Sequence, residues 1–364
     1  MLDRRLLTHL NWPLFICAGL MAAVGIVTIY SSTIESTAAI YQRQIYWLMI
    51  GTTVMVIFLI MDYTRVEFLS YFFYGAIVLM LVAVLVIGHS SSGAQRWINL
   101  GFISFQPSEF AKIALIVALS KCLAAKQIPY QGLNAKALAA PVLLVAVPFL
   151  LVAKQPDLGT AMVLLLIFSS MVLFVKIQRR TMVGIGLLCM AIVPLTWHFL
   201  KAYQKARLLS FLHPAKDPFG MGYHLIQSKI AIGSGGFLGK GFLKGTQGYL
   251  QFLPEHHTDF IFSILAEEWG FVGSFAVMGG FLILILIGLN IAREARDKFG
   301  TLLAFGVTSM LFWHIVINIG MVTGIFPVVG VPLPFMSYGG SFLVTVMLGI
   351  GILINVSMRR FLLR

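Results

Sequence analysis

The chain has 364 residues, of which 59% are hydrophobic and 11% charged, and its formal net charge is +13. Soluble domains average about 25% charged residues, so this composition excludes an ordinary soluble enzyme and indicates an integral membrane protein. The excess of Lys and Arg is explained by loops that face the cytoplasm, and no nucleic acid is expected as a partner. The cysteines Cys17, Cys122 and Cys189 stand singly in or beside apolar runs, which predicts core residues rather than metal ligands.

Ten apolar segments are long enough to cross a bilayer as helices, the form in which a backbone satisfies its own polar groups in lipid. The sequence therefore predicts an all-α, polytopic membrane protein, with one integral membrane domain over residues 1–364. The expected spans are 13–32, 44–61, 67–88, 108–124, 136–153, 159–175, 181–200, 268–291, 301–325 and 339–357.

The distribution of positive charge predicts the orientation of these spans. If the N-terminus is cytoplasmic, most Lys and Arg fall in cytoplasmic segments, and the short outer loops hold Arg43, Arg96 and Lys154. This bias is the positive-inside pattern, so both termini are expected in the cytoplasm. The long loop 201–258, between the seventh and eighth spans, is then extracytoplasmic.

The stretch "SSSGAQRWINLGFISFQPSEFAK", residues 90–112, leads into the fourth span. Pro107 and Ser108 are typical of a helix start, and Glu109 and Lys112 lie one turn apart, so that they can pair. Two interpretations remain: a buried structural ion pair, or a polar cavity to which Arg96 adds a cation. The short loop "KQPDLGTA", residues 154–161, offers Asp157 either as a helix cap or as a further acid facing that cavity.

The long loop 201–258 carries seven cations, an unusual number for an outer segment. Amphipathic "YHLIQSKIAI" and glycine-rich "GSGGFLGKG" favour an ordered, functional loop. So many cations suit an anionic ligand. They are Lys201, Lys205, Arg207, Lys216, Lys229, Lys240 and Lys244.

The segment "LPEHHTDFIFSILAEEWG", residues 253–270, gathers acidic residues in a chain that has 13 in all. Thr258 is a plausible N-cap, and Asp259 beside it would be favoured by the helix dipole. Glu267 and Glu268 lie deeper, against the eighth apolar span, where ionisable groups are costly and mark function by default. Farther on, "GIFPVVGVPLPFMSYGGS", residues 324–341, cannot form a helix interior and predicts an irregular loop at the same outer mouth.

These motifs together resemble the SEDS family of shape, elongation, division and sporulation proteins. The resemblance rests on "FLPEHHTDFIFSILAEEWGFVG", "GVPLPFMSYGGS", "GAQRWINLG", "QPSEFAK" and "KQPDLGTA", and it spans essentially the whole chain. The loop elements "GTQ" and "HTDFIF" are more similar to the RodA branch than to the FtsW branch.

The resemblance implies a peptidoglycan glycosyltransferase that polymerises lipid II into glycan strands at the outer face of the cytoplasmic membrane. It also implies that the Asp259 carboxylate is the essential catalytic group, acting as a general base or as a ligand of Mg²⁺ or Mn²⁺. Expected partners are a class B penicillin-binding protein, MreC and MreD. Candidate substrate-binding residues are Arg96, Glu109, Lys112, Asp157, Lys229, Lys240 and Glu268.

The alternatives are a lipid II flippase and a non-catalytic scaffold for the crosslinking enzyme. A flippase needs polar access from both leaflets, whereas polar residues gather on the outer half of this chain. A scaffold explains the apolar spans but leaves the buried acids without a role.

Overall fold

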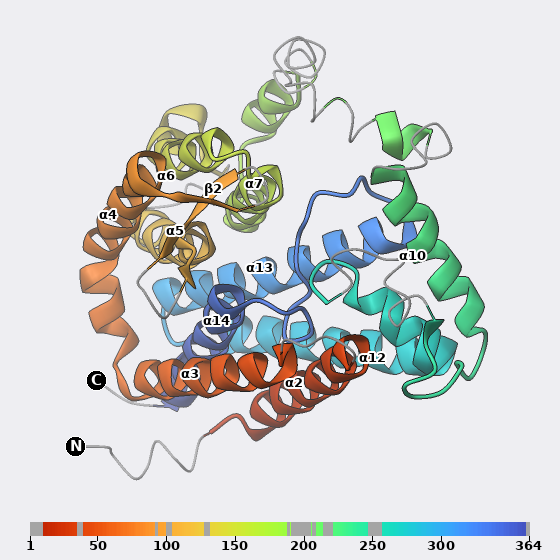
Figure 1. Ribbon diagram of the computed structural model, residues 1–364. Helices are drawn as coiled ribbons and strands as arrows, with labels where there is room; N and C mark the ends of the chain where they lie inside the picture. The colour runs from red at the N-terminus through yellow and green to blue at the C-terminus, as the bar shows by residue number, and fades with distance from the viewer. Residues whose placement is uncertain are drawn as a thin grey trace.

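The computed structural model describes residues 10–34, 39–91, 94–99, 104–126, 132–187, 190, 205, 209–213, 221–246 and 257–361. Helices dominate this part of the chain, and they pack side by side as a bundle (Figure 1). Seven of them are long and apolar enough to cross a membrane. The prediction of an all-α, polytopic membrane protein is confirmed.

The first half of the bundle consists of six described helices. They are α2 (Trp12–Thr33), α3 (Ile40–Ile60), α4 (Tyr63–Ile87), α5 (Pro107–Ala124), α6 (Ala135–Lys154) and α7 (Leu158–Phe174). Each matches a span predicted from the sequence. The seventh predicted span, 181–200, lies largely outside the described residues.

The second half begins with α10 (Met221–Gly235), which lies in the long loop and shows that its amphipathic part is ordered, as a helix. It continues with α12 (Ile261–Glu294), α13 (Lys298–Thr323), α14 (Gly340–Met358) and the short 3₁₀ helix η2 (Arg359–Phe361). Between α4 and α5, the strands β1 (His89–Ser91), β2 (Ala94–Asn99) and β3 (Ser104–Phe105) form a small antiparallel sheet in the order β1-β2-β3. The sequence had predicted a loop there.

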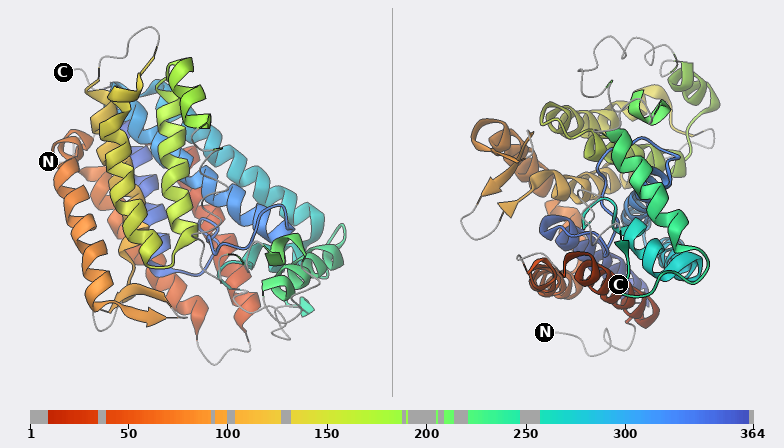
Figure 2. Two further views of the ribbon diagram at one scale, coloured as in Figure 1. Left: turned by 90° about the horizontal axis from the view of Figure 1, so that it is seen from above. Right: turned by 45° about the vertical axis from the view of Figure 1, so that its right-hand side comes forward.

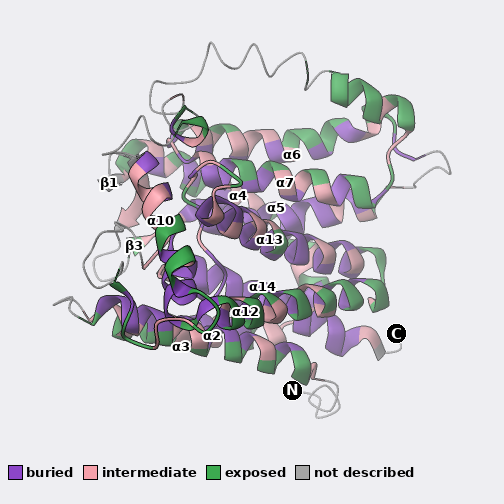
Figure 3. Cartoon of the chain, turned by 90° about the vertical axis from the view of Figure 1, so that its right-hand side faces the viewer, coloured by how far each residue is buried: buried purple, intermediate pink, exposed green. Residues whose placement is uncertain are grey.

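Helix α14 forms the centre of the bundle. Every residue from Ser341 to Met358 is buried, and α14 contacts α2, α3, α4, α5, α12 and α13. A helix that is apolar on all sides suits either a bilayer or a protein interior, and these contacts place α14 in the interior of the bundle. Figure 3 shows the buried residues concentrated on α14 and α13, with exposed ones on the outer helices.

The two ends of the bundle differ in character (Figure 2). The start of α2 and the end of α14 lie at one end, whereas the sheet, α10 and the loop before α14 lie at the other (Figures 2 and 3). At the first end, Asn355 donates hydrogen bonds to the carbonyls of Phe58, Leu59 (3.2 Å) and Met61 at the end of α3. Arg359 adds one to the carbonyl of Ile60 at 3.1 Å. These side chains satisfy carbonyls that a helix end leaves without partners.

Candidate active site

Asp259 lies in a turn just before α12, at the end of the bundle that carries α10. The residue is partly buried, and α12 begins at Ile261 with Phe260 as its N-cap. The expectation that Thr258 caps this helix is wrong, because the N-cap lies two residues later and the helix has no side-chain cap. The Thr258 carbonyl accepts a hydrogen bond from Ser337 Oγ at 2.5 Å, which holds the turn from outside.

Three contacts join this turn to residues 325–339, the loop between α13 and α14, here called the proline loop. Asn318 Nδ2 donates to the carbonyl of Asp259 at 2.9 Å and to that of Val331 at 2.8 Å. Ser337 Oγ accepts from Leu333 N at 2.8 Å while it donates to Thr258. The third contact joins Tyr338 N to the carbonyl of His257 at 2.9 Å.

Gly330 of the proline loop lies directly against the Asp259 carboxylate. A Cβ atom at Gly330 would lie 3.3 Å from Asp259 Oδ2, and the φ of Gly330 is +73°, which L side chains rarely adopt. Glycine therefore leaves room at the carboxylate that a larger residue would occupy. The proline loop, expected to be irregular at this mouth, is confirmed as such.

Beneath the proline loop, the predicted pair of Glu109 and Lys112 is present and buried. Lys112 Nζ lies 2.7 Å from Glu109 Oε2, and the side chains are 0% and 4% exposed. Lys112 Nζ also lies 2.9 Å from His314 Nε2, and His314 Nδ1 lies 3.1 Å from the carbonyl of Pro332. A polar chain thus runs from α5 through α13 to the proline loop.

Asp157 and Arg96 form a second cluster, at the start of α5 and α7. Asp157 accepts from Thr160 N at 3.3 Å as the N-cap of α7, so its capping role is confirmed. Arg96 Nη1 lies 3.8 Å from Asp157 Oδ1, and Arg96 also donates to the carbonyls of Gln155 (3.3 Å) and Pro156. Gln106, which precedes α5, donates to Asp157 Oδ2 at 3.4 Å and links the two clusters.

Glu267 and Glu268 lie in α12, and their side chains contact residues outside the proline loop. Glu267 Oε1 accepts from Lys240 Nζ at 2.6 Å and from Thr246 N and Oγ1, each at 2.8 Å. Glu268 is buried and accepts from Ser31 Oγ on α2. Lys240, predicted to bind substrate, is thus occupied in neutralising a buried carboxylate.

Helix α12 is broken two residues after Glu268, at Gly270, where φ is +64° and ψ −158°. Residues 235–241 fill the break. Lys240 N and Gly241 N donate to the carbonyls of Glu267 and Glu268, each at 3.0 Å. On the other side, Phe271 N and Val272 N donate to the carbonyls of Gly236 (2.9 Å) and Phe237 (3.2 Å).

We call this arrangement the splice. It joins residues 235–241 of the long loop to α12, and it explains the clustered glycines. A Cβ atom at Gly239 would lie 2.1 Å from the carbonyl oxygen of Glu268, and one at Gly270 would lie 2.3 Å from Gly239 N.

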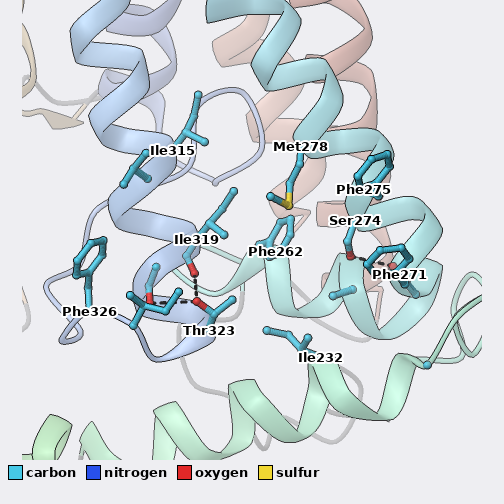
Figure 4. A pocket seen from close by; sticks show the side chains of 16 residues that line it. Ile232, Phe262, Phe271, Ser274, Phe275, Met278, Ile315, Ile319, Thr323 and Phe326 are labelled. Carbon is cyan, nitrogen blue, oxygen red and sulfur yellow. Dashed lines mark hydrogen bonds between the residues drawn. The ribbon is translucent and has the colours of Figure 1, made fainter.

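An apolar pocket of about 650 Å³ lies beside the splice, between α10, α12 and α13 (Figure 4). Phe262, Phe271 and Phe275 of α12 face Ile315 and Ile319 of α13 across it (Figure 4). Lys229 of α10 is exposed near this pocket, and its ammonium lies over Gly324 at the end of α13. Lys229 and the exposed Lys244 are therefore cations of the long loop whose described environment leaves them open to an anionic ligand.

The site that sequence reasoning identified is thus built from several parts. The structure brings Asp259 together with the proline loop, and it ties Glu109 and Lys112 to that loop through His314. Sequence reasoning assigned no role to His314, Asn318 or Ser337. The four-residue spacing of His314 and Asn318 places both on one face of a helix, which is the signal that could have identified them.

Comparisons with known proteins match this chain along most of its length. The sequence profile of the FtsW/RodA/SpoVE cell cycle proteins matches residues 11–361. The chain is 44% identical to the peptidoglycan glycosyltransferase MrdB of Escherichia coli over 324 residues, which is 88% of this chain and 86% of that protein. It is 32% identical to the peptidoglycan glycosyltransferase RodA of Treponema pallidum, over 93% of this chain and 95% of that one.

Two solved structures share the fold. One belongs to a peptidoglycan synthase complex that coordinates polymerization and crosslinking, with a TM-score of 0.85, 32% identity, and coverage of 97% of this chain and 98% of that one. The other is the rod shape-determining protein RodA of Thermus thermophilus, with a TM-score of 0.72, 28% identity, and coverage of 97% and 98%.

Proposed function

The chain belongs to the FtsW/RodA/SpoVE family of cell cycle proteins, and from this membership we propose that it is a peptidoglycan glycosyltransferase of the RodA branch. It polymerises lipid II into glycan strands at the outer face of the cytoplasmic membrane during cell elongation. The observation that carries this proposal is the placement of Asp259 at the outer mouth of the bundle, where Asn318 binds its backbone carbonyl and its carboxylate lies against Gly330 of the proline loop.

In the reaction, a sugar hydroxyl of one lipid II attacks the anomeric carbon of another. Asp259 accepts the hydroxyl proton as the new C–O bond forms. The bond from the anomeric carbon to the pyrophosphate breaks, and undecaprenyl pyrophosphate leaves with the electron pair. Attack on the face opposite the leaving group inverts the anomeric centre.

The leaving group carries its charge away, so cations take the place of a general acid. Lys229 is exposed and Arg96 partly so, and both are proposed to contact pyrophosphate. Lys112 is fully buried, and Lys240 is paired with Glu267, so these two act by holding the protein around the site. Glu109, Asp157 and Glu268 are likewise assigned to support the site, because each is at least 95% buried against a protein partner.

A divalent cation is part of the proposal, and Asp259 fits it as one ligand, which is the alternative to its role as the base. The described residues contain no group of three His, Cys, Asp or Glu side chains that would form an all-protein metal cage. Mg²⁺ usually takes one or two carboxylates together with phosphate oxygens of the substrate, so one acid suffices. When bound, Mg²⁺ or Mn²⁺ would neutralise charge on the leaving pyrophosphate.

The orientation is proposed from charge and architecture together. Lys and Arg favour cytoplasmic termini, and the bundle places the start of α2 and the end of α14 opposite α10 and the sheet. The active site then faces outward. Proposed partners are a class B penicillin-binding protein, in line with the fold shared with a peptidoglycan synthase complex, and MreC and MreD.

The test is polymerisation of lipid II by purified protein that carries Asp259→Asn. We expect the wild type to form glycan strands and the variant to lose activity by at least about 10²-fold, in the range of general-base catalysis. The matched control is Asp62→Asn at the opposite end of the bundle. Asp62 caps α4, and asparagine caps a helix equally well.

A fully active Asp259→Asn variant would exclude the catalytic role of this residue. If instead the wild type moves lipid II across vesicles and forms no strands, the protein is a flippase.

A further inference from the structure

His314 and Asn318 of α13 hold two neighbouring carbonyls of the proline loop. His314 Nδ1 lies 3.1 Å from the carbonyl of Pro332, and Asn318 Nδ2 lies 2.8 Å from that of Val331. The next residue toward the N-terminus is Gly330, against which the Asp259 carboxylate packs. One turn of α13 thus fixes the backbone that borders the catalytic acid.

The hydrogen-bond partners of His314 determine its tautomer. Lys112 carries an ammonium group, which can only donate, so His314 Nε2 must accept at 2.9 Å. The carbonyl of Pro332 can only accept, so Nδ1 must carry the proton. An imidazolium ring would turn an N–H toward the ammonium group, and the other neutral tautomer would lose both hydrogen bonds.

The surroundings leave this ring little freedom to turn. His314 is 2% exposed, Lys112 is 0% exposed and Glu109 is 3% exposed. The ring of Phe342 on α14 lies 4.8 Å from that of His314, and the Lys112 ammonium lies 5.2 Å from the Phe342 ring centre. Breaking one link would leave a buried polar group without a partner.

We propose that His314 is a positioning residue for glycosyl transfer. As the Nδ1–H tautomer, it ties the proline loop to the Glu109–Lys112 pair and so holds Gly330 in a fixed position against the Asp259 carboxylate. The inference rests on the proposed glycosyltransferase function, and His314 itself does not touch substrate. Its effect falls on the rate of transfer, because a shift of about 1 Å in a catalytic group costs about 10²-fold.

The first test compares His314→Leu with His314→Gln in lipid II polymerisation by the purified full chain. Leucine removes both hydrogen bonds, so kcat should fall by about 10- to 100-fold, while KM for lipid II stays within about three-fold. Glutamine has an N–H donor and a carbonyl acceptor, so it should restore kcat to within about five-fold of the wild type.

The matched control is Thr308→Ala, a buried residue of α13 whose hydroxyl donates to the carbonyl of Ala304 in its own helix. This control should keep kcat within about two-fold, which is the effect of removing one hydrogen bond that does not reach the proline loop.

A second measurement does not depend on activity. Nitrogen-15 NMR of labelled histidine, assigned by difference against His314→Gln, should show the Nδ1–H tautomer for His314 at about pH 7. An imidazolium ring or the Nε2–H tautomer would overturn the proposal.

Three kinetic results would also overturn the proposal. They are a change in His314→Leu that affects KM alone, equal losses of kcat in the leucine and glutamine variants, and a wild-type kcat in His314→Leu. If the wild-type protein fails to polymerise lipid II, the proposed function fails instead, while the NMR result still tests the geometry.

Discussion

Replacement of Gly270 by alanine should disrupt the splice. The backbone there has φ +64° and ψ −158°, a region that is essentially restricted to glycine and costs other residues about 1–3 kcal/mol. The new Cβ atom would also lie 2.3 Å from Gly239 N and 2.8 Å from the carbonyl carbon of Leu238. These are backbone atoms, so no rotation of a side chain can relieve the contact, and residues 235–241 must move.

Movement of that segment would lengthen or break the four hydrogen bonds of the splice, whose donor–acceptor distances are 2.9 to 3.2 Å. At about 0.5–1.5 kcal/mol each, they contribute about 2–6 kcal/mol. Together with the backbone strain, Gly270→Ala should cost about 3–9 kcal/mol, a large part of the stability of a folded protein. A loss of this size lowers Tm by on the order of 10 °C.

The assay is thermal unfolding in detergent, together with lipid II polymerisation well below the Tm of the variant. Gly279→Ala is the matched control, because Gly279 lies in the same helix with nothing within 4 Å of its Cβ position. That control should be neutral or gain about 0.5–1 kcal/mol, as expected for alanine in a helix interior. If Gly270→Ala matches Gly279→Ala in Tm and in rate, the splice has no energetic importance and the reasoning fails.

Three further substitutions test the remaining contacts. Lys112→Leu should destabilise the protein by about 3–5 kcal/mol, because it leaves the Glu109 carboxylate buried without its cation. Adding Glu109→Leu should recover part of that loss, and additive losses in thermal unfolding would argue against a coupled pair. Lys240→Ala should lower both Tm and polymerisation because Glu267 loses its cation, whereas the exposed Lys244→Ala should not, and equal effects would make the pair incidental. Asn355→Ala should cost about 1–3 kcal/mol in thermal unfolding through the carbonyls it leaves unsatisfied at the end of α3, and an unchanged Tm would contradict this.

Much of the fold follows from local sequence. Apolar runs and the Pro107 helix start predict the helices, because these features act within one segment. The Glu109–Lys112 pair follows from helical spacing in the same way. The capping role of Asp157 was one of two local interpretations, and the structure selects it.

Other features depend on contacts between distant segments and could not be predicted from local pattern. Thr258 has the chemistry of an N-cap, but the N-cap position falls on Phe260. Ser337, 79 residues away, donates a hydrogen bond to the Thr258 carbonyl and holds the turn. The break at Gly270 could not be predicted from its own apolar segment, because it depends on hydrogen bonds to residues 235–241. The residues 90–106 contain no strong alternation, so the sheet between α4 and α5 was read as a loop.

Burial of α14 on all sides has a consequence for biogenesis. This helix follows the others in the chain, so the ribosome releases it after they have entered the membrane, yet its place is at their centre. The inner faces of the earlier helices therefore gain their shared partner only when α14 is added. We expect a chain truncated before Gly340 to leave those faces uncovered and to be more sensitive to proteases than the intact chain.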